Sequence, residues 1–179
     1  MKELRTEIDI NAPAERVWQH LTDFAAFPEW NPFIPRIRGE LRAGSRLEVL
    51  LRASGTKGMT FRPTLKRVEP NRELRWLGHL GIPGLFDGEH IFEITPTGND
   101  RVRFVQREEF HGLLVPLLRR SLDRDTRRGF EEMNRALRAR AEESSSNLSR
   151  DARGGAKALS DSRGSLSGEG SSGRAVPDL

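Results

Sequence analysis

Three polar side chains occur where two neighbouring predicted strands otherwise place apolar residues on one side. Counting by two from Phe104 gives Gln106 and Glu108, and counting back from Phe92 gives His90. If these strands pair, all three side chains face the interior. An imidazole beside a carboxyl in an apolar pocket could transfer a proton, because burial moves both pKa values toward neutrality. Fixing the polar end of an apolar ligand is favoured over catalysis. Glu108 could instead lie in solvent at a bulged strand end.

Other catalytic arrangements lack the residues they require. The absence of cysteine excludes disulfides, thiolate metal sites and thiol nucleophiles, and the absence of tyrosine excludes a phenol as an acid. No serine lies in a Gly-x-Ser-x-Gly motif, and no glycine-rich phosphate loop occurs. The histidines show no spacing of three or four on a helix: His20, His79, His90 and His111. We therefore expect no metal and no cofactor, and the catalytic residues stay unassigned.

Charge and hydropathy limit the possible partners. The 179 residues carry 30 Lys and Arg against 26 Asp and Glu, a net charge of +4. The densest basic cluster, at 119–128, contains Asp123 and Asp125, so it is typical of a solvated helix face and we expect no nucleic-acid partner. The longest apolar run, 113–118, is far shorter than the roughly 20 residues that span a bilayer. The charged start of the chain lacks a signal-peptide pattern. We therefore expect a cytoplasmic location and no stable insertion into a membrane.

The composition changes at residue 144. Residues 144–179 are rich in Ser and Gly and contain no aromatic side chain. Such a segment buries too little apolar area to offset the entropy of ordering it. We therefore predict one ligand-binding domain over residues 1–143 and a disordered tail over 144–179.

Hydrophobic periodicity predicts an order of elements for this domain. Alternation predicts a first strand at 2–10, and a helix then runs to Thr22. A second short helix is predicted through Phe27, with Pro28 ending it. Six further strands follow, at 33–41, 45–53, 58–68, 72–80, 87–96 and 101–111. Hairpin-length connections between them indicate an antiparallel sheet with one dry face.

A long helix of about 29 residues is predicted to follow the last strand. Its apolar stripe falls at steps of three or four: Leu114, Leu118, Leu122, Thr126, Phe130, Met133 and Leu137. The stripe must be buried, and the apolar face of the sheet is the available partner.

Three segments in this order resemble the START-like (SRPBCC) superfamily, which includes polyketide cyclase/dehydrase-like and lipid-transfer proteins. They are Ile8 to Trp18, Phe27 to Pro32, and Gly129 to Leu137. The resemblance covers residues 2–143 and is specific for fold, since these are packing and turn motifs. It implies an α+β helix-grip fold, in which a curved antiparallel sheet of about seven strands (β-α-α-β6-α) wraps the long C-terminal helix. It also implies an apolar cavity between the sheet and that helix.

The candidates for lining such a cavity are mostly inward aromatic and aliphatic side chains. Taken singly, each of them is more typical of a dry core, whereas for the set as a whole the family resemblance favours a pocket. The candidate ligand-binding residues are Trp30, Phe61, Trp76, Phe86, His90, Phe92, Phe104, Gln106, Glu108, Leu114, Leu118, Leu122 and Phe130.

The connection from Gly78 to Gly88 combines glycines with apolar residues, among them Leu80, Ile82 and Phe86. Apolar side chains on a loop are costly to expose. The segment therefore predicts either a lid hinged over the cavity mouth or a long hairpin connection packed on the sheet edge. The sequence does not favour one over the other.

Three classes of function follow from these features. The favoured one is binding or transport of a small hydrophobic ligand, such as a lipid, polyketide or isoprenoid-like molecule. The second is a polyketide cyclase/aromatase-like enzyme in which a pocket His or Glu transfers protons. The third is a protein-interaction module similar to cochaperone-like or ribosome-associated relatives.

Overall fold

A computed structural model describes residues 2–52, 57–79, 81–117 and 122–143. The predicted tail therefore lies outside the described residues. Eight strands are described: β1 (Lys2–Ile10), β2 (Arg36–Arg38), β3 (Glu48–Leu51), β4 (Met59–Phe61), β5 (Thr64–Glu69), β6 (Glu73–His79), β7 (Asp87–Gly98) and β8 (Arg101–His111). The helical elements are α1 (Ala14–Thr22), the 3-10 turn η1 (Phe24–Ala26), α2 (Phe27–Trp30), the π-helical turn η2 (Leu122–Thr126) and a C-terminal α-helix over 127–143.

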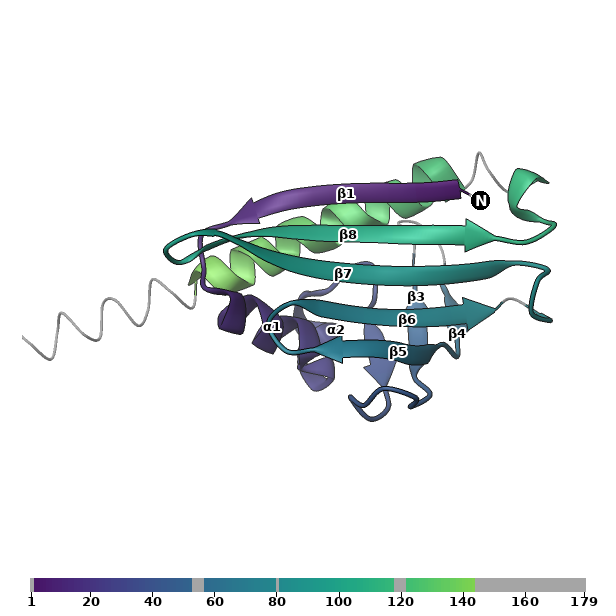
Figure 1. Ribbon diagram of the computed structural model, residues 1–179, viewed down its shortest axis with the longest axis horizontal. Helices are drawn as coiled ribbons and strands as arrows, with labels where there is room; N and C mark the ends of the chain where they lie inside the picture. The colour runs from purple at the N-terminus through teal and green to yellow at the C-terminus, as the bar shows by residue number, and fades with distance from the viewer. Residues whose placement is uncertain (1, 53–56, 80, 118–121, 144–179) are drawn as a thin grey trace, which may run out of the picture. The chain divides into compact units, whose positions relative to one another are not determined.

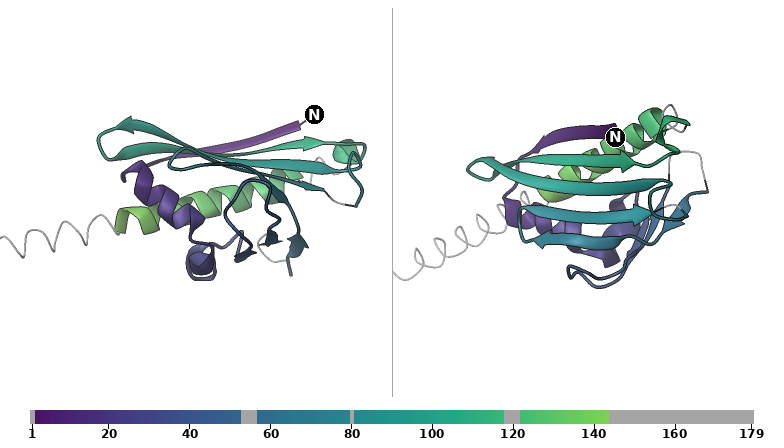
Figure 2. Two further views of the ribbon diagram at one scale, coloured as in Figure 1. Left: turned by 60° about the horizontal axis from the view of Figure 1, so that its bottom comes forward. Right: turned by 45° about the vertical axis from the view of Figure 1, so that its right-hand side comes forward.

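The main sheet is antiparallel, with strand order β1-β8-β7-β6-β5 (Figure 1). A second sheet has the order β2-β3-β4. Figure 2 shows the second sheet, α1 and the C-terminal helix on the same side of the main sheet. The predicted α+β helix-grip fold is confirmed, with a small second sheet added to it.

Proline explains why one predicted strand is two. The predicted strand at 58–68 divides into β4 and β5 at Pro63, which has no amide hydrogen to donate to a ladder. The carbonyl of Pro63 accepts a hydrogen bond from the Leu47 amide at 2.9 Å. Arg46 also forms a bridge with Thr64, so the two sheets are joined at the start of β5.

Pro28 is placed differently from its predicted position. It lies in the first turn of α2, where the missing amide hydrogen costs no helical bond. The helix therefore begins at Phe27 and continues to Trp30, and the prediction that Pro28 ends it is wrong.

Within the predicted long helix, the described residues 115–117 and 127–143 are α-helical, and η2 lies directly before the second of these segments. The approach of the C-terminal helix to the chain after α2 depends on Gly129, because a Cβ there would collide with the Phe33 ring. Phe33 also meets Phe130 edge-on, with ring centroids 5.6 Å apart. This contact positions the start of the helix beside Phe33.

The core is closed to solvent where the C-terminal helix packs against β7 and β8 of the main sheet. We call this region the closed end. Its side chains are essentially inaccessible to solvent, and they include Phe92, Phe104, Met133, Leu137 and Ala141.

Candidate functional site

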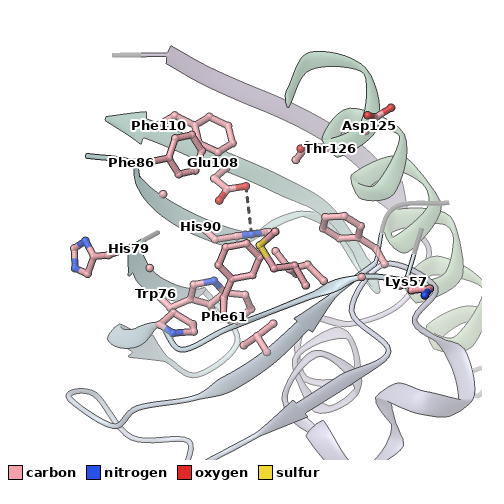
Figure 3. A pocket seen from close by; sticks show the side chains of 18 residues that line it. Lys57, Phe61, Trp76, His79, Phe86, His90, Glu108, Phe110, Asp125 and Thr126 are labelled. Atoms are coloured by element: carbon pink, nitrogen blue, oxygen red, sulfur yellow. Dashed lines mark ion pairs between the residues drawn. The ribbon is translucent and has the colours of Figure 1, made fainter. Parts of the chain in front are cut away.

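The other end of the main sheet holds a cavity of about 410 Å³. We call it the cavity end. It lies between β6, β7 and β8 of the main sheet and β3 and β4 of the second sheet, as Figure 3 shows from close by. Lys57, Met59 and His79 line it and are exposed, so the cavity opens to the surface. Asp125 and Thr126 of η2 line one side.

This position differs from the expected one. A cavity between the sheet and the C-terminal helix would be lined by residues of 127–143, and no described residue of that helix lines it. The opposing wall comes instead from Val49, Leu51 and Met59 of the second sheet. The helix contributes only through the turn that precedes it.

Five of the expected ligand-binding side chains line the cavity: Phe61, Trp76, Phe86, His90 and Glu108. They come from four different strands and the turn before β7. Strand pairing places Trp76, His90 and Glu108 directly opposite one another on β6, β7 and β8.

The other expected side chains are not part of this lining. Phe92, Phe104, Gln106 and Phe130 are fully buried in the core. Trp30 is half-buried, with its ring 5.1 Å from that of Phe27.

The remaining expected side chains come from the long helical prediction. Leu114 is half-buried against the core. Leu118 lies outside the described residues, and so does the side chain of Leu122.

Sequence reasoning missed the wall formed by the second sheet. Met59 shows the period of two that marks an apolar face, but nothing in its spacing indicates that β4 crosses over β6 and β7. Phe33 lines the cavity although it lies in no strand.

His90 and Glu108 form a buried polar pair in the wall of the cavity. Their Nδ1 and Oε2 atoms are 3.9 Å apart, and the dashed line in Figure 3 marks this contact. His90 is 1% exposed, and the Glu108 side chain is 14% exposed. Both side chains are therefore largely shielded from bulk solvent, although they line the cavity.

Burial sets the ionisation of both groups. Loss of hydration lowers the pKa of His90 from 6.5 to about 3. The same cause raises the pKa of Glu108 from 4.5 to about 8. Both side chains are consequently uncharged at pH 7, so their contact joins two neutral groups rather than an ion pair.

Aromatic rings account for the loss of hydration around His90. The centroid of its ring lies 4.4 Å from that of Phe92 in a stacked arrangement, and 4.9 Å from that of Phe130. The Trp76 ring is 5.1 Å away. A charged imidazolium at this position would lose its water shell and contact aromatic rings instead, which disfavours the charged form.

Two glycines leave the space beside Glu108. Gly78 and Gly88 are cross-strand partners on β6 and β7, and both line the cavity. A Cβ on Gly88 would lie 2.6 Å from Oε1 of Glu108. A Cβ on Gly78 would meet nothing closer than Pro63, at 3.7 Å. The glycine pair therefore forms a part of the cavity wall without side chains, next to the Glu108 carboxyl.

The turn between β6 and β7 is held by polar contacts. Asp87 accepts a hydrogen bond from the Gly84 amide at 2.9 Å, and its carboxyl lies 2.6 Å from Nδ1 of His79. Phe86 packs against Phe110, whereas Ile82 is 69% exposed. Leu80 lies outside the described residues, and a hinged lid here stays a prediction.

Two further expectations concern metals and membranes. Among the described residues, no group of three or more His, Asp or Glu side chains is placed to hold a metal ion. No helix in the described ranges is long and apolar enough to cross a bilayer.

Known structures share this architecture. A START superfamily protein from Mycobacterium smegmatis has a TM-score of 0.62 at 22% identity, covering 79% of this chain and 97% of that one. The Zhui aromatase/cyclase from Streptomyces sp. R1128 has a TM-score of 0.66 at 16% identity, covering 79% and 93%. A protein from Thermus thermophilus has a TM-score of 0.64 at 21% identity, covering 80% and 99%. No curated protein sequence matches the chain.

The chain shares the helix-grip fold of these structures, one of which is a START superfamily protein, as the expected resemblance implies. The sequence profile of a family described as "polyketide cyclase / dehydrase and lipid transport" matches residues 1–142. The chain belongs to that family.

Proposed function

We propose that the protein binds a small, mainly apolar ligand in the cavity between its two sheets. The observation that carries this proposal is the lining itself: mostly apolar side chains, with the buried polar pair His90 and Glu108 among them. A volume of about 410 Å³ lies within the range of about 300–1,000 Å³ that is usual for small-molecule sites. A lipid, polyketide or isoprenoid-like molecule has this chemistry.

The apolar side chains that face the cavity support the same proposal. Large side chains such as Phe61 and Trp76 could close a dry core, yet here they surround open volume. Such volume forfeits packing contacts that a bound apolar molecule restores. Family membership and the aromatase/cyclase among the similar structures agree with this class of ligand.

Native mass spectrometry of the full chain tests the proposal. The protein, purified without detergent, is expected to carry a small apolar molecule that organic extraction releases. Phe61→Ala is expected to lower its occupancy, while Arg103→Ala on the exposed Asp9 pair serves as the matched control. Wild-type protein that carries no molecule and takes up no apolar probe would contradict the proposal.

An enzymatic role is the second candidate, and one observation favours it. A protonated carboxyl lies 3.9 Å from a neutral imidazole in the cavity, and a carboxyl with a pKa of about 8 can donate a proton to a bound substrate at neutral pH. Turnover of a poly-ketone substrate that is lost in both Glu108→Gln and His90→Gln would support this role. Turnover retained in both variants would exclude it for this pair.

A further inference from the structure

The amide of Gln106 determines which nitrogen of His90 carries the proton. Nε2 of Gln106 lies 2.9 Å from Nε2 of His90 and 3.6 Å from Sδ of Met133. A thioether sulfur can only accept a hydrogen bond, and an amide nitrogen has two hydrogens to donate. Gln106 therefore donates to both neighbours. In this orientation Oε1 of Gln106 is buried and has no hydrogen-bond partner among the described residues.

The tautomer of His90 follows from that donation. A neutral imidazole has one nitrogen that accepts and one that donates. Because Nε2 accepts from Gln106, the hydrogen must be on Nδ1. Nδ1 is the nitrogen that faces Glu108, and both residues line the cavity (Figure 3). His90 thus presents a donor to the cavity.

Glu108 presents a second donor. Its carboxyl is neutral at pH 7 because burial raises its pKa to about 8, and a neutral carboxyl has one O–H to give. The 3.9 Å between His90 Nδ1 and Glu108 Oε2 is too long for a direct hydrogen bond. An oxygen about 2.8 Å from each of these atoms fits between them, at ordinary hydrogen-bond distances.

We propose that His90 Nδ1–H and the Glu108 O–H together bind one carbonyl oxygen of the ligand. This donor pair (His90 and Glu108) rests on the proposed function and names its ligand class: an apolar molecule with an uncharged ketone or similar carbonyl. A carbonyl oxygen accepts two hydrogen bonds and brings no donor of its own.

The charge of the donor pair explains the choice of a neutral group. Neither His90 nor Glu108 carries a charge at pH 7 that would balance a carboxylate or an ammonium. A charged head group placed between these two side chains would lose its hydration against two uncharged partners, since Lys57 and Asp125 line other parts of the cavity. Gln106 acts in this scheme as a positioning residue, since it contacts His90 and does not line the cavity.

Two rigid probes of nearly equal shape test the donor pair. Fluorene is wholly apolar, and 9-fluorenone adds one carbonyl oxygen. Binding to the full chain is measured by equilibrium dialysis at pH 7. The wild type is expected to bind 9-fluorenone about tenfold more tightly than fluorene, as two hydrogen bonds of ordinary net strength would give.

Two substitutions of Glu108 give the matched comparison. Glu108→Leu removes one of the two donors and is expected to reduce the preference for 9-fluorenone from about tenfold to about threefold. Glu108→Gln keeps an N–H donor in the same shape and is expected to retain most of the wild-type preference. The same reduction in both variants, or no reduction in either, would overturn the role of Glu108.

The outcomes separate this inference from the proposed function. Equal binding of the two probes by the wild type overturns the donor pair and leaves the ligand-binding function standing. If neither probe binds, the proposed function fails, and the donor pair fails with it.

The tautomer can be measured without any ligand. Histidine ¹⁵N NMR of the full chain is expected to show Nδ1 of His90 protonated and Nε2 unprotonated, with the ring assigned through its contacts to Phe92 and Phe130. Gln106→Leu is expected to give a mixture of tautomers. A hydrogen on Nε2 in the wild type would overturn the proposal whatever the probes do.

Discussion

The two ends of the main sheet share β7 and β8 and the same alternation of side chains. The closed end is nevertheless inaccessible to solvent, whereas the cavity end holds an open volume. At the closed end, Phe92 and Phe104 are fully buried. Nearer the other end of the same strands, His90 and Glu108 line a cavity of about 410 Å³. The inward direction of a side chain therefore does not decide whether it fills a core or faces a void.

The layer opposite the sheet makes the difference. The C-terminal helix supplies Met133 and Leu137 to the closed end, and both are fully buried. At the cavity end the opposite layer is the short strands β3 and β4, and the wall formed by the main sheet contains the glycine pair Gly78 and Gly88. The missing side chains of the glycine pair leave space between the two facing walls.

Truncation at the closed end is expected to have the largest effect. Phe104→Ala would leave a hole in a core without solvent access, which typically costs about 3–5 kcal/mol of unfolding free energy. Because Phe104 does not line the cavity, the variant molecules that stay folded should bind the probe with nearly unchanged affinity. Urea unfolding and dialysis with 9-fluorenone measure the two effects. A binding defect without a loss of stability would contradict the division into two ends and would favour a ligand-lining role for Phe104.

The ionisation of Glu108 should make the cavity end sensitive to pH. Its pKa is raised by burial, so the stability that this carboxyl contributes is complete below pH 4.5 and is lost as the pH rises through about 8. His90 acts in the opposite direction, since its lowered pKa removes stability as the pH falls from 6.5 toward about 3. Lys57, His79 and Asp125 line the same cavity and add smaller electrostatic effects.

Glu108→Gln isolates this pH dependence. Between pH 5 and 8, the unfolding free energy of the wild type should fall relative to that of the variant by at most about 1.4 kcal/mol per pH unit. Urea titrations at several pH values give the difference. A constant difference between the two proteins would show that Glu108 is not buried as described.

Truncation of a cavity wall should affect binding more than folding. Phe61 is half-buried in the unliganded protein, so Phe61→Ala is expected to cost about 1 kcal/mol of stability or less. The same change removes apolar contact with a ligand and should weaken 9-fluorenone binding about tenfold. Phe61→Leu serves as the control and should keep most of the affinity. Unchanged affinity in Phe61→Ala would place the ligand elsewhere.

The glycine pair offers the finest comparison. Gly88→Ala would bring a methyl group against Oε1 of Glu108, whereas Gly78→Ala would meet nothing closer than 3.7 Å. Because the Glu108 side chain can move, both changes are expected to alter stability by less than about 1 kcal/mol. Only Gly88→Ala should reduce the preference for 9-fluorenone over fluorene. Equal effects of the two substitutions would show that the position of the carboxyl does not matter.

Local patterns were enough to predict much of the fold. The alternation that predicts a strand at 2–10 matches β1 residue for residue, because one face of that strand packs on the core. Pro63 and Pro28 show where the prediction failed. The period of two continued across Pro63 although the ladder could not, and Pro28 was taken to end the helix that it helps to begin.

The site was predictable only in part, for a related reason. Counting by two along β7 and β8 placed His90, Gln106 and Glu108 on one face, and strand pairing brings them together. The same counting could not separate the buried Gln106 from the cavity-lining Glu108. That distinction depends on Met133 and on the second sheet, which contact these strands from distant parts of the sequence.

The methionine methyl groups report on both ends of the sheet at once. The chain has 3 methionines, of which Met59 lines the cavity and Met133 lies in the closed core. Titration of the ¹³C-methyl-labelled full chain with 9-fluorenone should shift the Met59 signal strongly and saturably and leave that of Met133 nearly unchanged. A Met59 signal that stays fixed at saturating probe, or equal shifts at both sites, would contradict a ligand cavity between the two sheets.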